Sequence, residues 1–341
     1  MREFLSLQLK LVPDLVKVMQ KRLYILRNIY LQQPIGRRSL AISLNTTERI
    51  LRGEVEFLKE QGLIHVESVG MFLTDTGLSL LESLEKLIKE VYGLSDLEKE
   101  LQNILKMERI IVVAGRSEES NLDKKELGRT AAGYLLSILK EDDIIALTGG
   151  STVAMMAEMM STSKTFPQAL FLPARGGLGE NVEWQASQIA ARCAKKLGAQ
   201  YRMFHVSDFL GATAYQTLQN DPYVSEMLKL IRSSQVVVHG VGRAIDMAIR
   251  RNAPEELLKT LRDGGAVGEA FGYYFDREGN IVHRMETMGL QLEDVKNARH
   301  VIGLAGGASK AEAISAIAKV GLVDVFIMDE SAAEAVLSLY R

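Results

Sequence analysis

The stretch from Asp142 to Met160, DDIIALTGGSTVAMMAEMM, decides the fold of the larger part of this chain. A short apolar run ends in a Thr-Gly-Gly-Ser-Thr turn, and an Ala/Met-rich helical pattern follows at once. In this order of strand, turn and helix, backbone N–H groups and the positive end of the helix dipole point above the turn. Gly149 and Gly150 permit close backbone approach, and the hydroxyls of Ser151 and Thr152 add donors. The turn therefore predicts an anion-binding site.

The same alternation of β-rich and helical segments continues from Arg109 to the C-terminus. The predicted strands lie in residues 109–115, 142–150, 168–177, 201–206, 234–242, 299–309 and 323–329. Strands that alternate with helices and end in Gly-rich turns predict a doubly wound parallel sheet with a ligand at its carboxyl edge. Residues 265–285 depart from this pattern, because they form extended pieces around a turn at 278–280, and they predict an insertion near the site.

Two further strand-end turns carry cations. Arg175 lies in PARGG, and Lys310 lies in GGASKAE, where a helix starts again. Because strand ends converge at one edge of the sheet, these turns and TGGST predict a phosphate-rich site, and the two helix starts leave room for a bisphosphate. Glu269 and Gln185 are candidates for hydrogen bonds to sugar hydroxyls, and each is equally open to a structural role.

Competing ligand classes lack their motifs. The segment VHGVGRAIDMA has Gly240 and Gly242 but Ile245 where a third glycine would complete a dinucleotide fingerprint, and no G-x-x-x-x-G-K-[ST] sequence exists. The five histidines are scattered, and the single Cys193 lies on an apolar helical face. We therefore expect no metal, no cofactor and no disulfide, and we interpret Cys193 as a core residue.

Length and composition indicate a globular protein of two domains. A chain of 341 residues exceeds the size at which single cores usually stop growing, and 47% hydrophobic with 25% charged residues excludes wholesale disorder. No apolar run is long enough to span a bilayer, and charged residues interrupt the N-terminal stretch where a secretory signal would be apolar. These features predict a cytoplasmic protein.

The charge is distributed unevenly along the chain. Residues 1–53 carry 10 Lys and Arg against 3 Asp and Glu, whereas residues 54–341 carry 31 against 40. A basic head on an acidic body predicts a polyanionic partner for the N-terminal part alone.

The head has the pattern of a winged helix-turn-helix. A helix that Pro34 closes is followed by two short helices, for which Ser39 and either Asn45 or Thr46 are candidate caps, with Glu48 completing a capping box. Residues 63–68 and 71–77 predict a hairpin, the wing. An ordinary three-helix bundle shows similar spacing, but the basic charge favours DNA binding. The predicted DNA-contacting residues are Arg37, Arg38, Thr46, Thr47, Arg49 and Arg52.

Three segments follow from these patterns: a DNA-binding domain at 1–78, a helical connector at 79–108 and an effector-binding domain at 109–341. In the connector, leucines and isoleucines recur at helical spacing from Leu80 to Leu105, and charged residues fill the other faces. Gly93 breaks the run, so we expect two helices. They are open to two interpretations, an ordinary pair of surface helices or a dimer seam.

The helix-turn-helix head together with ALTGGSTVAMMAE, PARGG and GLAGGASK resembles the SorC family of bacterial transcriptional regulators over essentially the whole chain. The resemblance implies a sugar-binding domain similar in fold to phosphosugar isomerases and deaminases, which is Rossmann-like, and dimers or tetramers on operator DNA. It is close to members that control glycolytic genes, and for those it implies fructose 1,6-bisphosphate as inducer. By the same resemblance the effector-binding residues would be Gly149, Gly150, Ser151, Thr152, Arg175, Gln185, Arg250, Arg251, Glu269 and Lys310. The N-terminal extension MREFLSLQLKLVPDLVKVM precedes the helices expected for the family, and dimer contacts are one role for it.

The leading functional hypothesis is a repressor of glycolytic genes whose cooperative operator binding weakens when a phosphorylated sugar fills the sheet-edge pocket. The alternative is an isomerase or deaminase that acts on phosphosugars. Such an enzyme needs a general base and a second acid, and Glu269 has no His or Asp partner at a readable spacing. A helix-turn-helix head also has no use in that enzyme, so we expect no catalytic residues.

Overall fold

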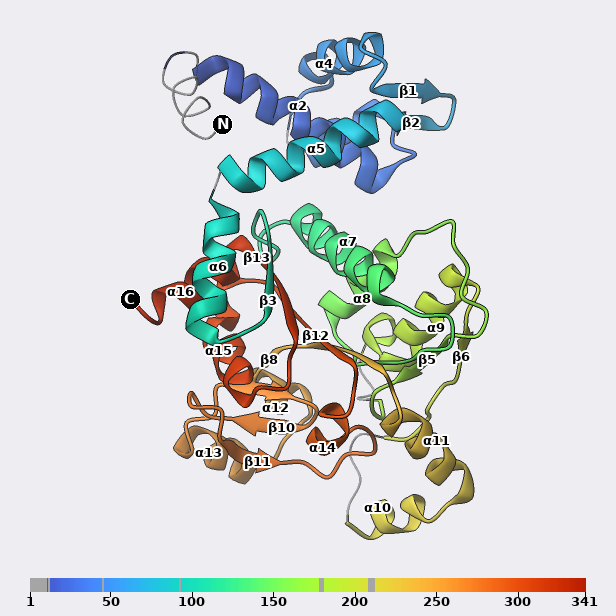
Figure 1. Ribbon diagram of the computed structural model, residues 1–341, viewed down its shortest axis with the longest axis vertical. Coiled ribbons are helices and arrows are strands. Elements are labelled where there is room, and N and C mark those ends of the chain that lie inside the picture. The colour runs from blue at the N-terminus through green and yellow to red at the C-terminus, as the bar shows by residue number, and fades with distance from the viewer. Residues whose placement is uncertain (1–10, 12, 45, 92, 178–180, 208–211) are drawn as a thin grey trace. The chain divides into compact units, whose positions relative to one another are not determined.

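The computed structural model describes residues 11–341 except 12, 45, 92, 178–180 and 208–211 (Figure 1). The chain divides into two compact units, Met1–Asp96 and Leu97–Arg341. This division falls within the segment predicted as the connector. In the described part of the chain, no helix is long and apolar enough to cross a membrane.

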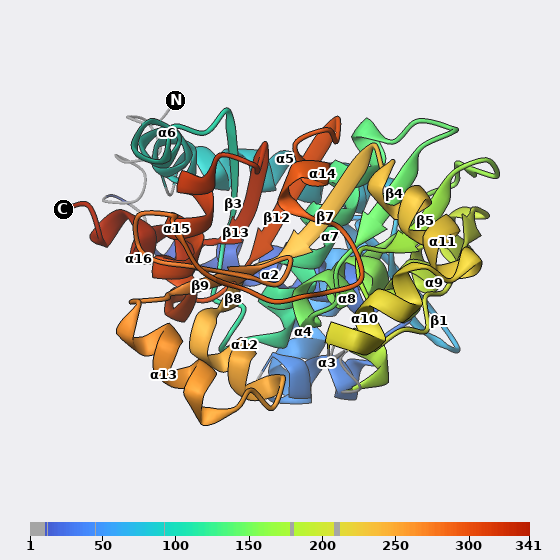
Figure 2. The same cartoon turned by 90° about the horizontal axis from the view of Figure 1, so that it is seen from below.

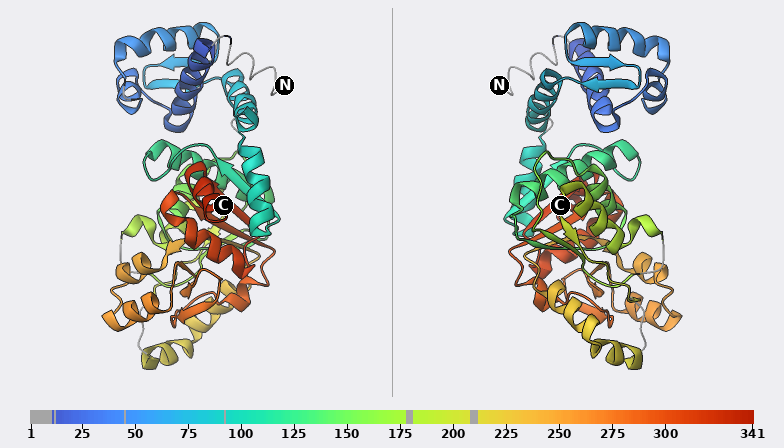
Figure 3. Two further views of the ribbon diagram at one scale, coloured as in Figure 1. Left: turned by 90° about the vertical axis from the view of Figure 1, so that its left-hand side faces the viewer. Right: turned by 90° about the vertical axis from the view of Figure 1, so that its right-hand side faces the viewer.

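The first unit is a winged helix-turn-helix, as predicted. Its elements are α2 (Pro13–Gln32), α3 (Arg37–Ser43), α4 (Glu48–Glu60), β1 (Ile64–Glu67), β2 (Gly70–Leu73) and α5 (Asp75–Val91). The antiparallel hairpin β1–β2 lies beside α2 in the views of Figure 3, where this unit is blue to cyan. Leu26 and Ile29 of α2 pack with Leu51 and Val55 of α4 in one apolar core, so the helix pair and its support form a single folded body.

The structure corrects the predicted helix starts. Gly36, not Ser39, precedes α3, because Ile35 pairs with Met71 of the wing through two backbone hydrogen bonds of 3.4 and 2.9 Å and the helix starts directly afterwards. Thr47, not Thr46, caps α4: its side chain accepts a hydrogen bond from the Ile50 N–H.

The capping box predicted with Glu48 does not form, since Glu48 is the first helical residue, and the alternative cap Asn45 lies outside the described residues.

The structure also describes part of the N-terminal extension. Residues 13–19 of the extension belong to α2, which continues without interruption to Gln32, shortly before Pro34.

The connector forms two helices, as predicted. Gly93, with φ of 74°, separates α5 from α6 (Leu94–Leu105). On α5, Leu81 is buried in the core of the first unit, whereas Leu80 is 37% exposed. In the second unit the Glu98 carboxylate of α6 accepts a hydrogen bond of 2.7 Å from the Val112 N–H, which fixes α6 to the first strand of the sheet.

The second unit is built on a seven-stranded parallel sheet in the order β3-β13-β12-β7-β4-β5-β6, which Figure 2 shows from β3 to β5. The strands are β3 (Arg109–Val113), β4 (Ile144–Leu147), β5 (Leu170–Pro173), β6 (Gln200–Tyr201), β7 (Val236–Gly240), β12 (His300–Ala305) and β13 (Val325–Asp329). All seven lie within or overlap the predicted segments. The strand predicted at 201–206 is the weakest, because only residues 200 and 201 pair with β5.

Helices cover both faces of this sheet. On one face α7 (Asn121–Ile138), α8 (Ser151–Met159) and α9 (Ala186–Leu197) share a core with alternate strand residues such as Ile145 and Val238. The other face is covered by α11 (Pro222–Arg232), α15 (Ala311–Val320) and α16 (Glu330–Ser338). The strand residues that point to this face, such as Ala146 and Val237, are buried as well. Cys193 lies in the core of α9, as predicted, and burial raises the pKa of its thiol to about 12.

The departure predicted at residues 265–285 is a second sheet. It is antiparallel, in the order β11-β10-β9-β8. Its strands are β8 (Gly242–Arg243), β9 (Gly268–Ala270), β10 (Tyr273–Phe275) and β11 (Ile281–Arg284), and α12 (Ala244–Arg250) and α13 (Glu255–Asp263) pack with it, shown in orange in Figure 1. Because β8 follows β7 directly, this sheet begins at the carboxyl edge of the large one.

Candidate functional site

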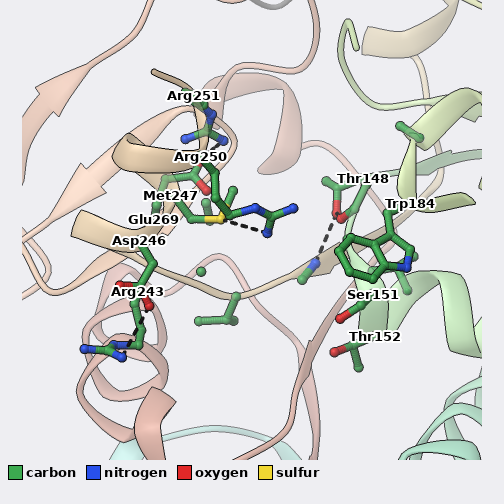
Figure 4. A pocket seen from close by; sticks show the side chains of 18 of the residues that line it. Thr148, Ser151, Thr152, Trp184, Arg243, Asp246, Met247, Arg250, Arg251 and Glu269 are labelled. Carbon is green, nitrogen blue, oxygen red and sulfur yellow. Dashed lines mark hydrogen bonds and ion pairs between the residues drawn. The ribbon is translucent and has the colours of Figure 1, made fainter. Parts of the chain in front are cut away.

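The candidate site lies where the strand order of the large sheet reverses. β4 and β7 are neighbours in the sheet. After β4 the chain continues to β5 on one side of this pair, and after β7 it continues to β12 and β13 on the other side. The loops that follow β4 and β7 therefore diverge and leave a crevice between them. The N–H of Gly240, the last residue of β7, donates to the Thr148 hydroxyl directly after β4 over 3.1 Å. Here the structure has a pocket of about 300 Å³, drawn in Figure 4. All ten predicted effector residues line it: Gly149, Gly150, Ser151, Thr152, Arg175, Gln185, Arg250, Arg251, Glu269 and Lys310.

One wall of the pocket is the start of α8. Gly150 is its N-cap, with φ of 119°, a conformation that L side chains rarely adopt. The Gly149 Cα lies so near the Trp184 carbonyl that an added Cβ would approach this oxygen to 2.7 Å. The Gly150 N–H is not available to a ligand, since it donates to the Trp184 carbonyl over 2.9 Å. The anion donors at this end are therefore the first-turn amides from Ser151 onward and the hydroxyls of Ser151 and Thr152.

The opposite wall is a buried charge cluster around Glu269 on β9. One oxygen of its carboxylate accepts hydrogen bonds from Arg251 Nη2 at 2.9 Å, from Arg175 Nη1 at 3.2 Å and from the Gly272 N–H at 2.8 Å. Burial raises the pKa of Glu269, but Arg251 and Arg175 outweigh it and hold the pKa below its ordinary value. The carboxylate is therefore ionised and engaged by two cations, which leaves the cluster one positive charge in excess.

Arg251 is itself held by several contacts. It caps α12, is almost wholly buried, and donates through Nη1 to the Tyr274 hydroxyl over 3.0 Å. The preceding Arg250 extends into the pocket, where its guanidinium lies 3.7 Å from the Met247 sulfur and 5.9 Å from the centre of the Trp184 ring (Figure 4). The two neighbouring arginines are therefore different: Arg251 is fixed by the protein, and Arg250 faces the ligand space.

A second helix start forms another part of the lining. β12 ends at Ala305, Gly307 precedes the 3₁₀ turn Ala308–Lys310, and this turn leads into α15. The Glu118 carboxylate accepts a hydrogen bond from the Ser309 hydroxyl and packs against Gly307. Burial lowers the pKa of Lys310, although Glu118 acts in the opposite direction. A cation beside a helix start supplies a second set of anion donors.

His239 on β7 lies beneath the site without reaching it. Burial lowers the pKa of this imidazole to about 4, so it is neutral at pH 7, and its ring packs 4.7 Å from that of Phe271. Its Nδ1 lies 3.2 Å from the Gly240 carbonyl, and Nε2 has no partner among the described residues. Among the described residues His239 therefore forms no hydrogen bond with Glu269 and does not serve as its acid partner.

Several lining residues had no signal in the sequence. They include Glu118, Asn181, Trp184, Arg243, Asp246 and Met247. Thr148 could have been found, since it begins the TGGST turn. Trp184 lies in a 3₁₀ turn, and Glu118 lies in the loop after β3, and only the tertiary fold brings these loops to the mouth of the β4 turn.

The predicted DNA-contacting residues fall on one helix pair. Arg37 and Arg38 begin α3, Arg49 and Arg52 lie on α4, and all four are exposed. Thr46 is half-buried in the turn, where its N–H donates to the Ala41 carbonyl over 3.0 Å. Thr47 is exposed but its hydroxyl oxygen caps α4, so it has one lone pair fewer for DNA.

These two units define a class of protein. A winged helix-turn-helix with exposed arginines on its helix pair, joined to a doubly wound domain with a pocket lined by helix starts and arginines, is the architecture of a transcriptional regulator that senses a small ligand. The comparisons with known proteins give the family.

The sugar-binding domain family matches residues 89–338, and the CggR N-terminal DNA binding domain family matches residues 18–88. Over 335 residues, 98% of each chain, this sequence is 47% identical to the central glycolytic genes regulator of Priestia megaterium. The same regulator of Bacillus subtilis is 46% identical over 337 residues, 99% of each chain. A SorC family regulator from Enterococcus faecalis is 38% identical with a TM-score of 0.66, over 71% of this chain and 99% of that one. The chain belongs to the SorC family of sugar-binding transcriptional regulators, and it is a DNA-binding regulator, not an enzyme.

Proposed function

We propose that this chain represses glycolytic genes and leaves its operator when a phosphorylated sugar, fructose 1,6-bisphosphate, fills the pocket at the β4–β7 switch point. In this proposal the protein acts as a homo-oligomer, a dimer that assembles into a tetramer on operator DNA, and works in the cytoplasm. The relatives from Priestia megaterium and Bacillus subtilis are both named central glycolytic genes regulator, which supports the choice of target genes.

The observation that carries the proposal is the presence of two helix starts in the lining of one pocket. The start of α8 supplies Ser151 and Thr152, and the turn before α15 supplies Lys310. Each is suited to a phosphate group, and a sugar with a phosphate at both ends would engage both. Arg175 and Arg250 add positive charge to the same lining, and the amide of Gln185 is suited to a sugar hydroxyl.

Ligand and DNA would be linked through a coupling free energy. If the bisphosphate favours one arrangement of subunits and the operator favours another, each weakens the binding of the other by the same factor. A coupling of about 1 to 3 kcal/mol, roughly 5- to 150-fold in affinity, is sufficient for such a switch.

The test is a series of thermal melts of the purified chain with fructose 1,6-bisphosphate, fructose 6-phosphate, glucose 6-phosphate and inorganic phosphate. A ligand that binds only the native state raises the melting temperature with its concentration. The proposal expects a larger rise with the bisphosphate than with either monophosphate. Equal rises with inorganic phosphate would contradict a two-phosphate pocket.

A further inference from the structure

The recognition helix α4 carries a glycine that its own domain does not require. Leu51, Val55 and Leu58 form the buried face of α4, and Gly53 lies on the opposite, exposed face in the helix interior. A Cβ added to Gly53 would meet no atom within 4 Å, and its φ is not in the left-handed region. After proline, glycine is the least favourable residue in a helix interior. Packing among the described residues therefore gives no reason for it.

A second helical glycine shows what an internal reason looks like. Gly128 lies inside α7, where an added Cβ would come within 2.8 Å of the backbone of Met155 on α8. There the glycine permits two helices of the same domain to approach closely. At Gly53 the equivalent space is open, so a molecule outside this domain has room to approach the helix backbone closely there.

The residues around Gly53 indicate which molecule this is. Arg49 lies four residues before Gly53 and Ile50 three residues before it, which places both beside it on the helix surface. Among the described residues Arg49 forms no ion pair, whereas Glu54 on the flank is engaged by Lys21 at 2.9 Å and Arg22 at 2.9 Å. Ile50 is 53% exposed although it is a large apolar side chain. An unpaired guanidinium beside an exposed aliphatic group suits DNA, which offers phosphates, base edges and thymine methyl groups.

We propose that Gly53 is the point of closest approach of α4 to the major groove of DNA, and that this approach brings Ile50 against a thymine methyl group. Any side chain at position 53 would hold the helix away from the bases. Glu56 lies on the same exposed face one turn later, so contact is confined to the N-terminal half of α4. The proposal rests on the proposed DNA-binding face of α4.

The first test compares Gly53→Ala with Gly133→Ala in the full chain. Gly133 is a matched control, because it is exposed in the interior of α7 and an added Cβ there also meets no atom within 4 Å. Both variants are read by calorimetric melting and by affinity for an operator that the wild-type chain selects from a random DNA pool.

Gly53→Ala should raise the melting temperature of the first domain by about 4 °C, because alanine is the better helix former. It should nevertheless weaken operator binding by about tenfold. Gly133→Ala should leave operator binding unchanged. Wild-type affinity in Gly53→Ala, or a lower melting temperature, would overturn the proposal.

The second test uses Ile50→Ala on the selected operator and on the same duplex with uracil in place of every thymine. Uracil lacks only the C5-methyl group, so the loss of affinity seen with Ile50→Ala on thymine DNA should disappear on uracil DNA. An equal loss on both duplexes would overturn the methyl contact. Failure of the DNA-binding face itself would appear separately, as an unaltered operator affinity in Arg49→Ala.

Discussion

The cations of the pocket and those of the recognition helix are held in opposite ways. In the pocket Arg175 and Arg251 are buried and share the Glu269 carboxylate over 3.2 and 2.9 Å. On the head Arg49 and Arg52 are exposed, with no ion pair among the described residues. Removing one partner of a buried pair leaves the other as a desolvated charge, so such a change affects folding strongly. An exposed cation contributes little to folding, so it remains free to neutralise a phosphate, and its effect is screened by salt.

The largest expected effect is that of Glu269→Ala, which removes the shared anion from the two buried guanidinium groups. The free energy of unfolding should fall by about 3 to 5 kcal/mol, since the charges that remain have no counter-ion. Denaturant unfolding followed by circular dichroism measures this. Glu119→Ala is the control, because Glu119 pairs with Arg116 over 3.3 Å at the surface, where the loss should stay below about 1 kcal/mol. Equal losses in the two variants would remove the distinction between buried and exposed pairs.

Arg175→Ala should abolish the response to the sugar. At a bisphosphate concentration 100 times its dissociation constant, the wild type gains about 2.7 kcal/mol of stability, and the variant should gain almost none. Operator affinity without sugar should stay near the wild-type value, because Arg175 is in the second unit. Arg202→Ala removes a surface arginine that pairs with Glu226 over 2.8 Å, and it should keep the full response. A variant at 175 that still responds fully would exclude this residue from the pocket chemistry.

The free energy of unfolding of the second unit should depend on pH through His239. Burial lowers the pKa of this side chain to about 4, so between pH 6.5 and 4 the unfolded chain binds more protons than the folded one. The stability contribution of the neutral imidazole should therefore be complete well above pH 6.5 and should decrease as the pH falls, by about 2 kcal/mol between pH 7.5 and 5. His239→Leu should flatten this part of the profile in denaturant titrations. An unchanged slope in the variant would show that another group titrates.

Arg49→Ala should have the smallest effect on folding, within about 0.5 kcal/mol. If Arg49 contacts one phosphate, the slope of log affinity against log salt should decrease in magnitude by about 0.9. Lys21→Ala serves as the control, since Lys21 is in the same domain but pairs with Glu54 over 2.9 Å. Fluorescence anisotropy with operator DNA at several salt concentrations measures both slopes. Equal slopes of log affinity against log salt for wild type and Arg49→Ala would show that Arg49 does not contact a phosphate.

The sequence predicted those parts of the site that depend on local chemistry. The TGGST turn combines a strand, glycines and a helix start within a few residues, and the structure places it in the pocket as expected. The seven parallel strands are also predictable from the sequence, because each is a short apolar run that a turn follows. Glu269 was a weaker candidate, since its engagement by Arg175 and Arg251 depends on a sheet formed from a distant segment.

Other features depend on competition that local rules do not resolve. Asn45, Thr46, Thr47 and Ser39 are all good cap residues, and the choice depended on the Ile35–Met71 pairing and on the Thr46 N–H bond to Ala41. Leu80 and Leu81 both fit a helical period, and tertiary packing buries only Leu81. Trp184 and Glu118 reach the pocket from loops, whose paths short-range propensity does not specify.

The coupling between the pocket and DNA binding is tested most directly by the operator affinity of the wild-type chain with and without fructose 1,6-bisphosphate, at one salt concentration. Inorganic phosphate at equal ionic strength is the control. We expect the bisphosphate to weaken operator binding by about 5- to 150-fold and inorganic phosphate to leave it unchanged. An identical affinity in both conditions, while calorimetry shows the bisphosphate bound, would contradict the coupling of the pocket to DNA.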